Sequence, residues 1–342
     1  MMRVVTFGEL MLRLQPQGYG RFVQAESFEL RFGGAEANVA VSLAGFGAES
    51  VYVTKLPEHE IGQAAVNALR RYGVDVSHIV RGGERVGIYF NEKGASQRPS
   101  KCIYDRAGSA ISKSVNSDFD WNGIFSGADW FHLTGVTPAL GGELPAICEE
   151  ACACAKKLGL TVSCDLNYRS KLWTKEDARS AMKKICQYVD VCVANEEDAR
   201  DVFGIEAECT DVERGMLNKA DYENVARRLS ENLGFKKVSI TLRTSINANQ
   251  NKWAALLYDA GSDSASYSPE YEMMIVDRLG GGDSFAAGLI YSLLRKSTDQ
   301  EAVNFAAAAG CLKHSVEGDW NMVSVSEVES LLKGNASGRI QR

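Results

Sequence analysis

Short apolar segments alternate with longer amphipathic ones along most of the chain. Runs rich in β-branched and aromatic residues, which are typical of buried strands, lie at 4–7, 51–54, 130–133, 162–165, 191–194 and 238–242. Between them, apolar residues recur at helical spacing in 62–72, 144–158 and 177–187. A further strand is predicted at 253–258 and an alanine-rich helix at 301–313. The alternation predicts an α/β fold of βαβ units on a mostly parallel sheet.

Two segments interrupt this alternation. Residues 9–32 and 85–111 carry Gly, Pro and short extended stretches such as VGIYF and KCIYD. This composition predicts turns and short strands rather than a βαβ unit. We therefore expect a small β-rich appendage inserted into one large domain that spans residues 1–342.

The stretch IVDRLGGGDSFAAGLIY, residues 275–291, joins a glycine run to a predicted helix. Apolar residues follow Asp283 at i, i+3, i+4 and i+7 spacing, which places the glycines at the N-terminus of that helix. Because they lack Cβ atoms, Gly280, Gly281 and Gly282 can adopt positive φ and bring their N–H groups close to a ligand. The free amides and the helix dipole add a positive potential. This segment therefore predicts an anion site.

Asp283 stands next to that anion site, where its own charge would repel a bound anion. Two interpretations of the residue are compatible with each other. Aspartate is a preferred N-cap and can simply start the helix. Alternatively, the anion is a phosphoryl group in transfer, and the carboxylate accepts the proton of the attacking hydroxyl. The residue types alone do not separate these two roles.

Charge and composition favour a small-molecule substrate. The chain has 342 residues, of which 45% are hydrophobic and 24% charged, with a formal net charge of −6. This is enough for a large core, and the acidic balance argues against nucleic acid or an anionic membrane as partner. The nine cysteines at irregular spacing, the lack of an apolar run of membrane-spanning length and an N-terminus that enters a strand directly predict a reducing, cytoplasmic setting.

Two motifs resemble those of one enzyme family. DRLGGGD at 277–283 is similar to the signature Asp-Thr-x-Gly-Ala-Gly-Asp of PfkB/ribokinase-type sugar kinases, with Arg278 and Gly281 in place of Thr and Ala. FGGAEANVAVSLAGFG at 32–47 resembles the N-terminal signature of the same family. The order of the motifs also matches, and the resemblance covers essentially the whole chain. It implies a ribokinase-like three-layer fold with helices flanking the central sheet and with 9–32 and 85–111 as a small β-sheet lid.

Within the family, several stretches resemble the branch that phosphorylates 2-keto-3-deoxygluconate. They are IYDRAGSA at 103–110, DLNYRSKLW at 165–173, and the tail motifs GDWNMVS and GNASGRIQR at 318–324 and 334–342. The resemblance implies ATP- and Mg²⁺-dependent phosphorylation of that sugar acid at its 6-hydroxyl in sugar-acid breakdown. The rival interpretations are a kinase of this family for fructose, ribose, a nucleoside or a related keto sugar acid, and a non-catalytic sugar-sensing relative.

The resemblance also implies roles for individual residues. Asp283 would be the catalytic base, beside an anion hole formed by Gly280, Gly281 and Gly282. The residues implied to bind the sugar acid are Gly34, Asn38, Tyr89, Tyr104, Arg106, Arg169 and Asp319. Those implied to bind ATP are Asn167, Thr241, Arg243, Asn304 and again Gly280 and Gly282. The stretch NEED at 195–198 is similar to the family's Asn-x-x-Glu motif, so Asn195 and Asp198 would bind Mg²⁺ through water, with Asp198 a shorter arm than Glu.

Elementary chemistry supports one part of this assignment independently. A carboxylate is held best by the planar, always charged guanidinium group, so Arg106 and Arg169 are expected to clamp the acid group of the sugar. Without the resemblance, exposed arginines and packing tyrosines would be the more common interpretation. The resemblance leaves a monovalent cation open as a further cofactor. It also implies a homodimer or larger homo-oligomer, formed through the open edges of the lid sheet.

Overall fold

A mostly parallel sheet forms the centre of the molecule. The structure is a computed structural model that describes residues 2–206 and 219–335, so residues 336–342 of the second tail motif lie outside it. Within these ranges the sheet has nine strands in the order β14-β13-β12-β11-β10-β9-β1-β4, with β15 beside β13. The strands are β1 (Arg3–Phe7), β4 (Glu49–Val53), β9 (Trp130–Thr134), β10 (Thr161–Asp165), β11 (Val191–Asn195), β12 (Lys237–Asn247), β13 (Gln250–Asp259), β14 (Ser264–Tyr267) and β15 (Tyr271–Met274). Neighbouring strands from β12 to β4 are parallel, whereas β13 pairs antiparallel with β12, β14 and β15.

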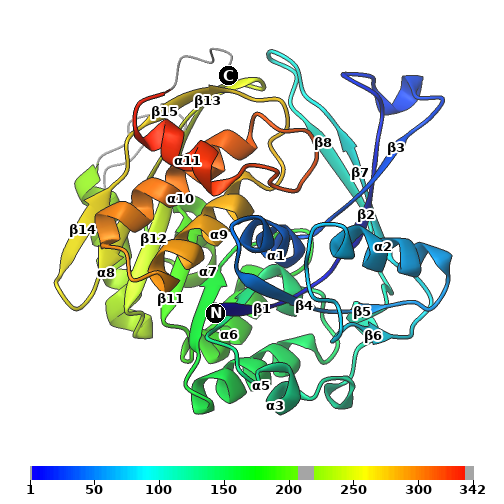
Figure 1. The fold of residues 1–342 in the computed structure, drawn as a ribbon, viewed down its shortest axis with the longest axis horizontal. Helices are drawn as coiled ribbons and strands as arrows, with labels where there is room; N and C mark the ends of the chain where they lie inside the picture. Colours follow the sequence, from blue (N-terminus) through cyan, green and yellow to red (C-terminus); the bar gives the residue numbers. More distant parts are fainter. Residues whose placement is uncertain (1, 207–218, 336–342) are drawn as a thin grey trace.

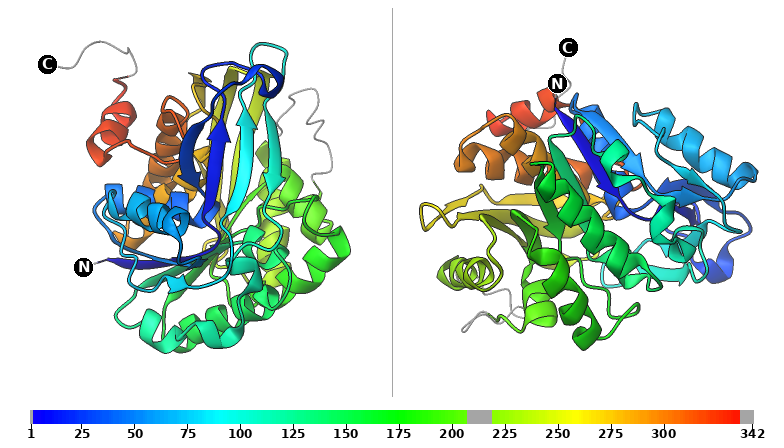
Figure 2. Two further views of the ribbon diagram at one scale, coloured as in Figure 1. Left: turned by 90° about the vertical axis from the view of Figure 1, so that its right-hand side faces the viewer. Right: turned by 90° about the horizontal axis from the view of Figure 1, so that it is seen from below.

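Helices cover both faces of this sheet and produce three layers (Figures 1 and 2). The first face carries α1 (Ala35–Gly45), α9 (Gly281–Leu294), α10 (Asp299–Lys313) and α11 (Val325–Leu332). The second carries α3 (Trp121–Ile124), α5 (Leu144–Lys157), α6 (Lys175–Cys186), α7 (Glu196–Phe203) and α8 (Lys219–Leu233). In β1, Val4 packs into the first layer, whereas Val5 and Phe7 pack into the second. Both faces of the strands are therefore buried, which explains why they are near-continuous apolar runs in the sequence.

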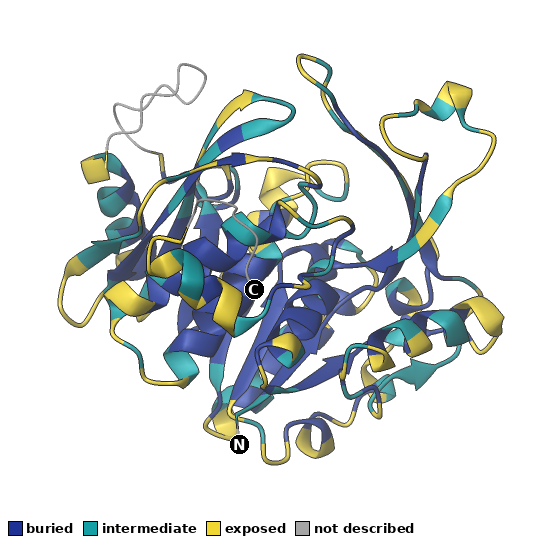
Figure 3. Ribbon diagram, turned by 45° about the horizontal axis from the view of Figure 1, so that its top comes forward, coloured by how far each residue is buried: buried dark blue, intermediate teal, exposed yellow. Residues whose placement is uncertain are grey.

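A second, four-stranded sheet lies beside the three layers, in the order β3-β2-β7-β8. Its strands are β2 (Met11–Gln15), β3 (Glu29–Gly33), β7 (Gly87–Glu92) and β8 (Lys101–Asp105). Apart from Gly33 they fall within the two segments that interrupt the predicted βαβ pattern. Figure 3 shows these strands leaving the body, with β2 and β7 mostly buried, β8 mostly exposed, and exposed residues in the loops at their tips. Below, we call this four-stranded unit the small sheet.

Strand register gives the small sheet two different faces. Arg31, Arg13, Tyr89 and Tyr104 lie side by side across the four strands on one face. The adjacent row, on the opposite face, consists of Leu30, Leu14, Phe90 and Ile103. Because side chains alternate between faces along a strand, one face is polar and the other apolar.

The remaining elements are short or lie beside the small sheet. They are α2 (Glu60–Arg70), α4 (Val136–Ala139), β5 (Lys55–Leu56), β6 (Val80–Arg81) and the 3₁₀ turns η1 (Phe22–Gln24), η2 (Ile111–Lys113) and η3 (Asn116–Asp118). None of the described helices combines the length and apolar character needed to cross a bilayer.

Each strand and helix predicted from the sequence is found, and its bounds differ from the predicted ones by three residues or fewer except at one end. Strand β12 continues to Asn247 instead of ending at residue 242. Its added residues pair with β13, as Arg243 does with Trp253. This pairing satisfies the backbone groups of a polar stretch that has no strand-like apolar pattern of its own.

Candidate active site

A cavity of about 360 Å³ opens where the carboxyl ends of β10, β11 and β12 meet the N-termini of α1 and α9. Ligands in open α/β sheets bind beyond the carboxyl ends of the strands, so this is the expected place. The predicted site residues that line the cavity are Gly34, Asn38, Tyr89, Tyr104, Arg106, Asn167, Arg169, Asn195, Asp198, Thr241, Arg243, Gly280, Gly282, Asp283 and Asp319. Gly281 and Asn304 are not among its lining residues. Asn304 instead accepts a hydrogen bond from Gln300, one turn earlier on α10 (2.8 Å).

The glycine run adopts a different geometry from the one expected. Only Gly280 has a positive φ, +81°, while Gly281 and Gly282 already belong to α9. A Cβ on Gly280 would lie 1.9 Å from the carbonyl oxygen of Asp319, and one on Gly281 would lie 2.1 Å from the ring of His314. A Cβ on Gly282 would meet no heavy atom within 4 Å. Close packing, rather than a positive φ, therefore explains why position 281 is a glycine. At Gly282 the missing side chain leaves open space on the cavity side.

Asp283 lies in the first turn of α9 and faces the cavity. Its Oδ2 accepts a hydrogen bond from Nδ2 of Asn38 (2.6 Å). The interpretation of Asp283 as an N-cap is wrong, because Gly280 occupies the N-cap position and the helix has no side-chain cap. Burial raises the pKa of Asp283 to about 6, although the Asn38 hydrogen bond acts in the opposite direction. A carboxylate held this way can act as a general base at neutral pH.

The α1 N-terminus brings the N-terminal motif to this carboxylate. Asn38 is buried, and its Oδ1 accepts a hydrogen bond from the backbone N–H of Gly34 (3.3 Å), which orients the amide so that its NH₂ group points at Asp283. A Cβ on Gly34 would lie 2.0 Å from the carbonyl oxygen of Glu9, so only glycine permits this approach of helix and strand.

Arg106 reaches the cavity from the end of β8 but already has a partner. Its Nε donates to Oε2 of Glu9 (2.7 Å), and both side chains are almost fully buried. Ser109 also donates to the same carboxylate. The Arg106 guanidinium lies over the ring of Tyr104, with 5.5 Å between Cζ and the ring centroid. Glu9, which carries no predicted role, thus fixes the position of Arg106.

A second buried ion network lies beneath the small sheet. Arg13, fully buried, forms ion pairs with Asp277 (Nη2 to Oδ2, 2.6 Å) and with Asp319. Tyr89 donates its hydroxyl to Oδ2 of Asp319 (2.6 Å). The predicted ligand residues Tyr89 and Asp319 are therefore linked through Arg13 to the start of the glycine loop. Arg13 carries no predicted role, and the signal that could have revealed it is the inward side of β2, where polar residues alternate with apolar ones.

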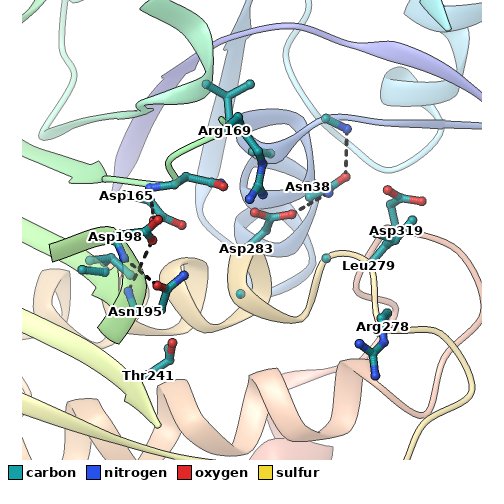
Figure 4. Close-up of a pocket in the computed structure, with 18 of the residues that line it drawn as sticks. Asn38, Asp165, Arg169, Asn195, Asp198, Thr241, Arg278, Leu279, Asp283 and Asp319 are labelled. Carbon is teal, nitrogen blue, oxygen red and sulfur yellow. Dashed lines mark hydrogen bonds between the residues drawn. The ribbon is translucent and has the colours of Figure 1, made fainter. Parts of the chain in front are cut away.

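Three other arginines line the cavity without a carboxylate partner. Within residues 2–206 and 219–335 no ion pair is found for Arg169, Arg243 or Arg278. Arg169 comes from the loop after β10, and Figure 4 shows its side chain extending toward Asp283. Arg243 lowers the pKa of Arg278 by like-charge repulsion, after the larger effect of desolvation. These three guanidinium groups are therefore open to a bound anion, although five carboxyl groups also line the cavity.

Two acidic side chains, Asp165 and Asp198, lie together to one side of Asp283 (Figure 4). Asp165 ends β10, and its Oδ1 accepts from the backbone N–H of Asn167 (3.2 Å), a residue in the left-handed region at φ 38°. Burial raises the pKa of Asp165 well above its usual range, and the charges of Asp198 and Asp283 add to this. Asp165 belongs to a motif noted in the sequence, but no role was predicted for it.

Asn195 and Asp198 cap the helix that follows β11. Oδ1 of Asn195 accepts from the N–H groups of Glu197 and Asp198 (both 2.9 Å), and Asp198 accepts from the N–H groups of Asn195 (3.4 Å) and Tyr168 (2.9 Å). Burial raises the pKa of Asp198 to about 6. The part of the chain that the structure describes contains no cluster of three or more His, Cys, Asp or Glu side chains that could hold a metal ion. Asp165 and Asp198 are hard oxygen donors, and the charge of Asp198 raises the pKa of Asp165. Such a pair nevertheless fits a hydrated Mg²⁺ whose other ligands are phosphates.

One comparison with known proteins decides the family. The model of the pfkB family of carbohydrate kinases matches residues 1–324. The chain is a pfkB family carbohydrate kinase. This kinase is 33% identical to the 2-dehydro-3-deoxygalactonokinase of Haloferax volcanii, with 98% of each chain covered. It is 30% identical to the 2-dehydro-3-deoxygluconokinase of Thermoproteus tenax, over 97% of this chain and 95% of the relative.

Solved structures agree with this assignment. The crystal structure of the 2-dehydro-3-deoxygluconokinase of Thermotoga maritima superimposes on this kinase with a TM-score of 0.94 and 50% identity, covering 98% of this chain and 100% of that one. The predicted ribokinase-like three-layer fold and the predicted family are thereby confirmed. The alternative of a non-catalytic sugar sensor is set aside, because the family is one of kinases.

Proposed function

We propose that this kinase transfers the γ-phosphoryl group of ATP to the 6-hydroxyl of 2-keto-3-deoxygluconate, also called 2-dehydro-3-deoxygluconate. One observation supports a sugar acid, rather than a neutral sugar, as the substrate. Arg169 has no carboxylate partner among the described residues, lies in the same cavity as Asp283, and lowers the pKa of that carboxyl by its charge. The charge of Arg169 also lowers the pKa of Asp165 and Asp198, but no described carboxylate forms an ion pair with it. Its planar guanidinium is therefore open to the carboxylate of a sugar acid, a group that a neutral sugar does not have. The name of the Thermotoga maritima relative agrees with this choice.

In the proposed reaction, Asp283 is the general base. Above its pKa of about 6 the carboxylate is ionised and accepts the proton of the 6-hydroxyl. The hydroxyl oxygen bonds to the γ-phosphorus, and ADP leaves with the electron pair of the broken P–O bond. The backbone amides of Gly280, Gly281 and Gly282 stabilise the negative charge on the transferring group. Asn38 keeps the carboxylate pointed at the hydroxyl through its 2.6 Å hydrogen bond.

The proposed sugar and nucleotide contacts follow the two ends of the cavity. Arg106 and Arg169 bind the sugar carboxylate, and Gly34, Tyr89, Tyr104 and Asp319 contact the rest of the sugar acid. On the other side, Asn167, Thr241 and Arg243 bind ATP, with Asn304 predicted to reach the adenine. Mg²⁺ would be held through water by Asp198, Asn195 and Asp165, where it would neutralise charge on the ATP phosphates.

We also propose that the small sheet acts as a lid over the sugar. Its polar face carries Tyr89 and Tyr104 into the cavity. Movement of this unit toward the body would exclude water from the site and limit wasteful hydrolysis of ATP.

The outer face of the same sheet supports a homo-oligomer. Leu30 and Ile103, which belong to its apolar row, are 54% and 53% exposed. Exposed apolar side chains and an open sheet edge favour association with another molecule, and a second copy of this chain would remove both from solvent. Sedimentation velocity of the protein and of an Ile103→Lys variant tests this, with the variant expected to be monomeric.

The identity of the sugar acid has a second candidate. The Haloferax volcanii relative is named for the galactonate form, which differs from the gluconate form in the configuration at C4. A kinase for that epimer would use the same carboxylate contacts, since these do not involve C4.

An ATP-consumption assay over a panel of sugars tests the proposal. The panel contains 2-keto-3-deoxygluconate, its C4 epimer, fructose and ribose, with ³¹P NMR to locate the phosphate in the product. We expect a kcat/KM for one of the two acids that exceeds the values for the neutral sugars by at least about 100-fold, the equivalent of about 2.7 kcal/mol. Equal or greater efficiency with a neutral sugar would contradict the assignment.

A further inference from the structure

Lys313, the last residue of α10, is a fully buried cation that the reaction described above does not use. Its side chain has no solvent exposure, and Nζ donates to the carbonyl oxygens of Asp277 and Val316, both at 3.3 Å. No ion pair between Lys313 and a carboxylate is found in the described part of the chain. A buried ammonium without a carboxylate partner is costly, so its position calls for a reason.

The two carbonyls belong to the two segments that build the phosphate end of the site. Asp277 begins the DRLGGGD loop, and Val316 lies in the turn that leads to Asp319. The segments are joined by further bonds: the N–H groups of Val276 and Asp277 donate to the carbonyl oxygen of His314 (2.8 and 3.2 Å). The Lys313 ammonium therefore lies where the loop that leads to Asp283, the proposed base, meets the turn that leads to Asp319, a proposed sugar-binding residue.

The lysine also packs directly against the glycine loop. A Cβ on Gly280 would approach Cε of Lys313 to 3.3 Å, so the lysine stem lies behind the first glycine of the anion hole. Lys313 is not among the residues that line the cavity. It therefore cannot act by touching ATP or sugar in this arrangement, only through the loop that it supports.

Burial and the neighbouring charges act on the pKa of this ammonium in opposite directions. Desolvation lowers the pKa of Lys313, while the charges of Asp277, Asp319 and Asp283 raise it and that of Arg13 lowers it. The three carboxylates thus partly compensate the cost of a cation held by carbonyl dipoles.

We propose that Lys313 is a positioning residue for phosphoryl transfer, an internal cation that binds the carbonyl oxygens beside the glycine loop and orients the loop amides. Backbone carbonyls grouped in this way are the ligands that a monovalent cation would need, and the ammonium already occupies them. The monovalent cation left open by the sequence is therefore not required. The inference rests on the proposed function in one respect, namely that the loop binds the transferred phosphoryl group.

The test compares kcat in chloride salts of K⁺, NH₄⁺, Na⁺ and choline at constant ionic strength. Wild-type kcat is expected to agree within twofold in all four salts. Lys313→Ala, which leaves a space of about the right size, is expected to lose about 100-fold in kcat while KM for the sugar acid changes less than threefold. Ammonium or K⁺ should then restore kcat at least tenfold over choline.

Lys313→Met fills the same space with an apolar chain, so its kcat should be low in every salt. Lys333→Ala, an exposed lysine, serves as the matched control.

Several results would overturn the proposal. A wild-type kcat more than fivefold higher in K⁺ than in choline would show that an external cation is needed. A kcat for Lys313→Ala within threefold of wild type, or a loss that no cation restores in a variant with native circular dichroism, would reduce Lys313 to a packing role. Should Lys313→Ala fail to fold, the wild-type salt series decides alone.

Failure of the proposed substrate is distinguishable from failure of this inference. If wild type phosphorylates neither sugar acid, the substrate assignment fails. ATP affinity, measured by calorimetry for wild type and Lys313→Ala in ammonium and in choline, still tests the lysine. A weaker affinity in the variant that ammonium restores supports the inference, and equal affinities contradict it.

Discussion

Two sets of charged residues at and around the cavity are held in different ways. Under the small sheet, Arg106 is paired with Glu9, and Arg13 is paired with Asp277 and Asp319. Each of these guanidinium groups has its carboxylate partner before any ligand arrives. Buried pairs of this kind fix geometry, since neither member can leave without exposing an unpaired charge.

The charges around Asp283 are the opposite case. Asp283 has a single hydrogen bond, from Asn38, and Arg169 lies near it with no carboxylate partner among the described residues. Charges that the protein leaves unbalanced in a cavity are available to a ligand. The comparison teaches that paired charges fix the geometry of the site, including the position of Arg106 at the cavity, whereas unpaired charges are free to interact with a ligand.

The strongest test of this division is Asp283→Asn. The variant keeps the shape and the contact with Asn38 but cannot accept a proton. We expect kcat to fall by at least about 1,000-fold while ATP and the sugar acid bind nearly normally, as measured by steady-state kinetics and calorimetry. Turnover close to wild type would remove this carboxylate from the mechanism.

Breaking a paired charge should act mainly on stability. Arg106→Ala leaves the Glu9 carboxylate, 3% exposed, without its guanidinium. We expect the free energy of unfolding to fall by about 3 to 5 kcal/mol, measured by urea denaturation. Glu9→Gln together with Arg106→Ala should recover part of this loss, because no buried charge then remains unpaired. A stability equal to wild type in the single variant would refute the positioning role of the pair.

Removing an unpaired charge should act mainly on substrate binding. Arg169→Ala is expected to raise KM for the sugar acid about 10- to 150-fold, which corresponds to a loss of about 1.5 to 3 kcal/mol in binding free energy. The free energy of unfolding should change little. Arg169→Lys should rescue this only in part, since an ammonium cannot form two parallel bonds to a carboxylate. An analogue with a hydroxymethyl group in place of the carboxylate should be far less affected, and equal losses for both compounds would rule out the carboxylate clamp.

Lowering the pH should change kcat less than these substitutions change activity or stability. A base must be ionised to accept a proton, and burial has raised the pKa of Asp283 to about 6. Activity should therefore be constant above that pH and fall as pH decreases through it, to about one tenth at pH 5. A profile that stays flat down to pH 5 would contradict Asp283 as the base.

The smallest effect is expected at an exposed ion pair at the edge of the small sheet. Arg85 forms an ion pair with Asp105 (Nη1 to Oδ1, 2.9 Å), with the two side chains 35% and 53% exposed. Because solvent screens such a pair, Arg85→Ala should change kcat and KM by less than twofold. This variant is the matched control for Arg106→Ala, and a comparable loss of stability in both would show that burial does not distinguish them.

Much of the site could be predicted because its residues lie in local motifs. Gly280 and Asp283 lie in one stretch that starts a helix, and Gly34 and Asn38 lie in another. The supporting residues were harder to find. Glu9 and Arg13 are single charged residues in a mostly apolar stretch, and nothing local tells whether such a side chain faces solvent or a partner 97 or 306 residues away.

By itself, the sequence determined the strands and helices, the small sheet, and the glycine loop with Asp283 directly after it. These depend on periodicity and on short-range backbone requirements, which neighbouring residues impose on one another. Only the tertiary structure decided that Gly281 packs on His314, that Arg106 is paired while Arg169 is not, and that Lys313 is buried behind the loop. These features depend on which distant side chains share one desolvated space, and the energy of a buried charge is set by those neighbours rather than by its place in the chain.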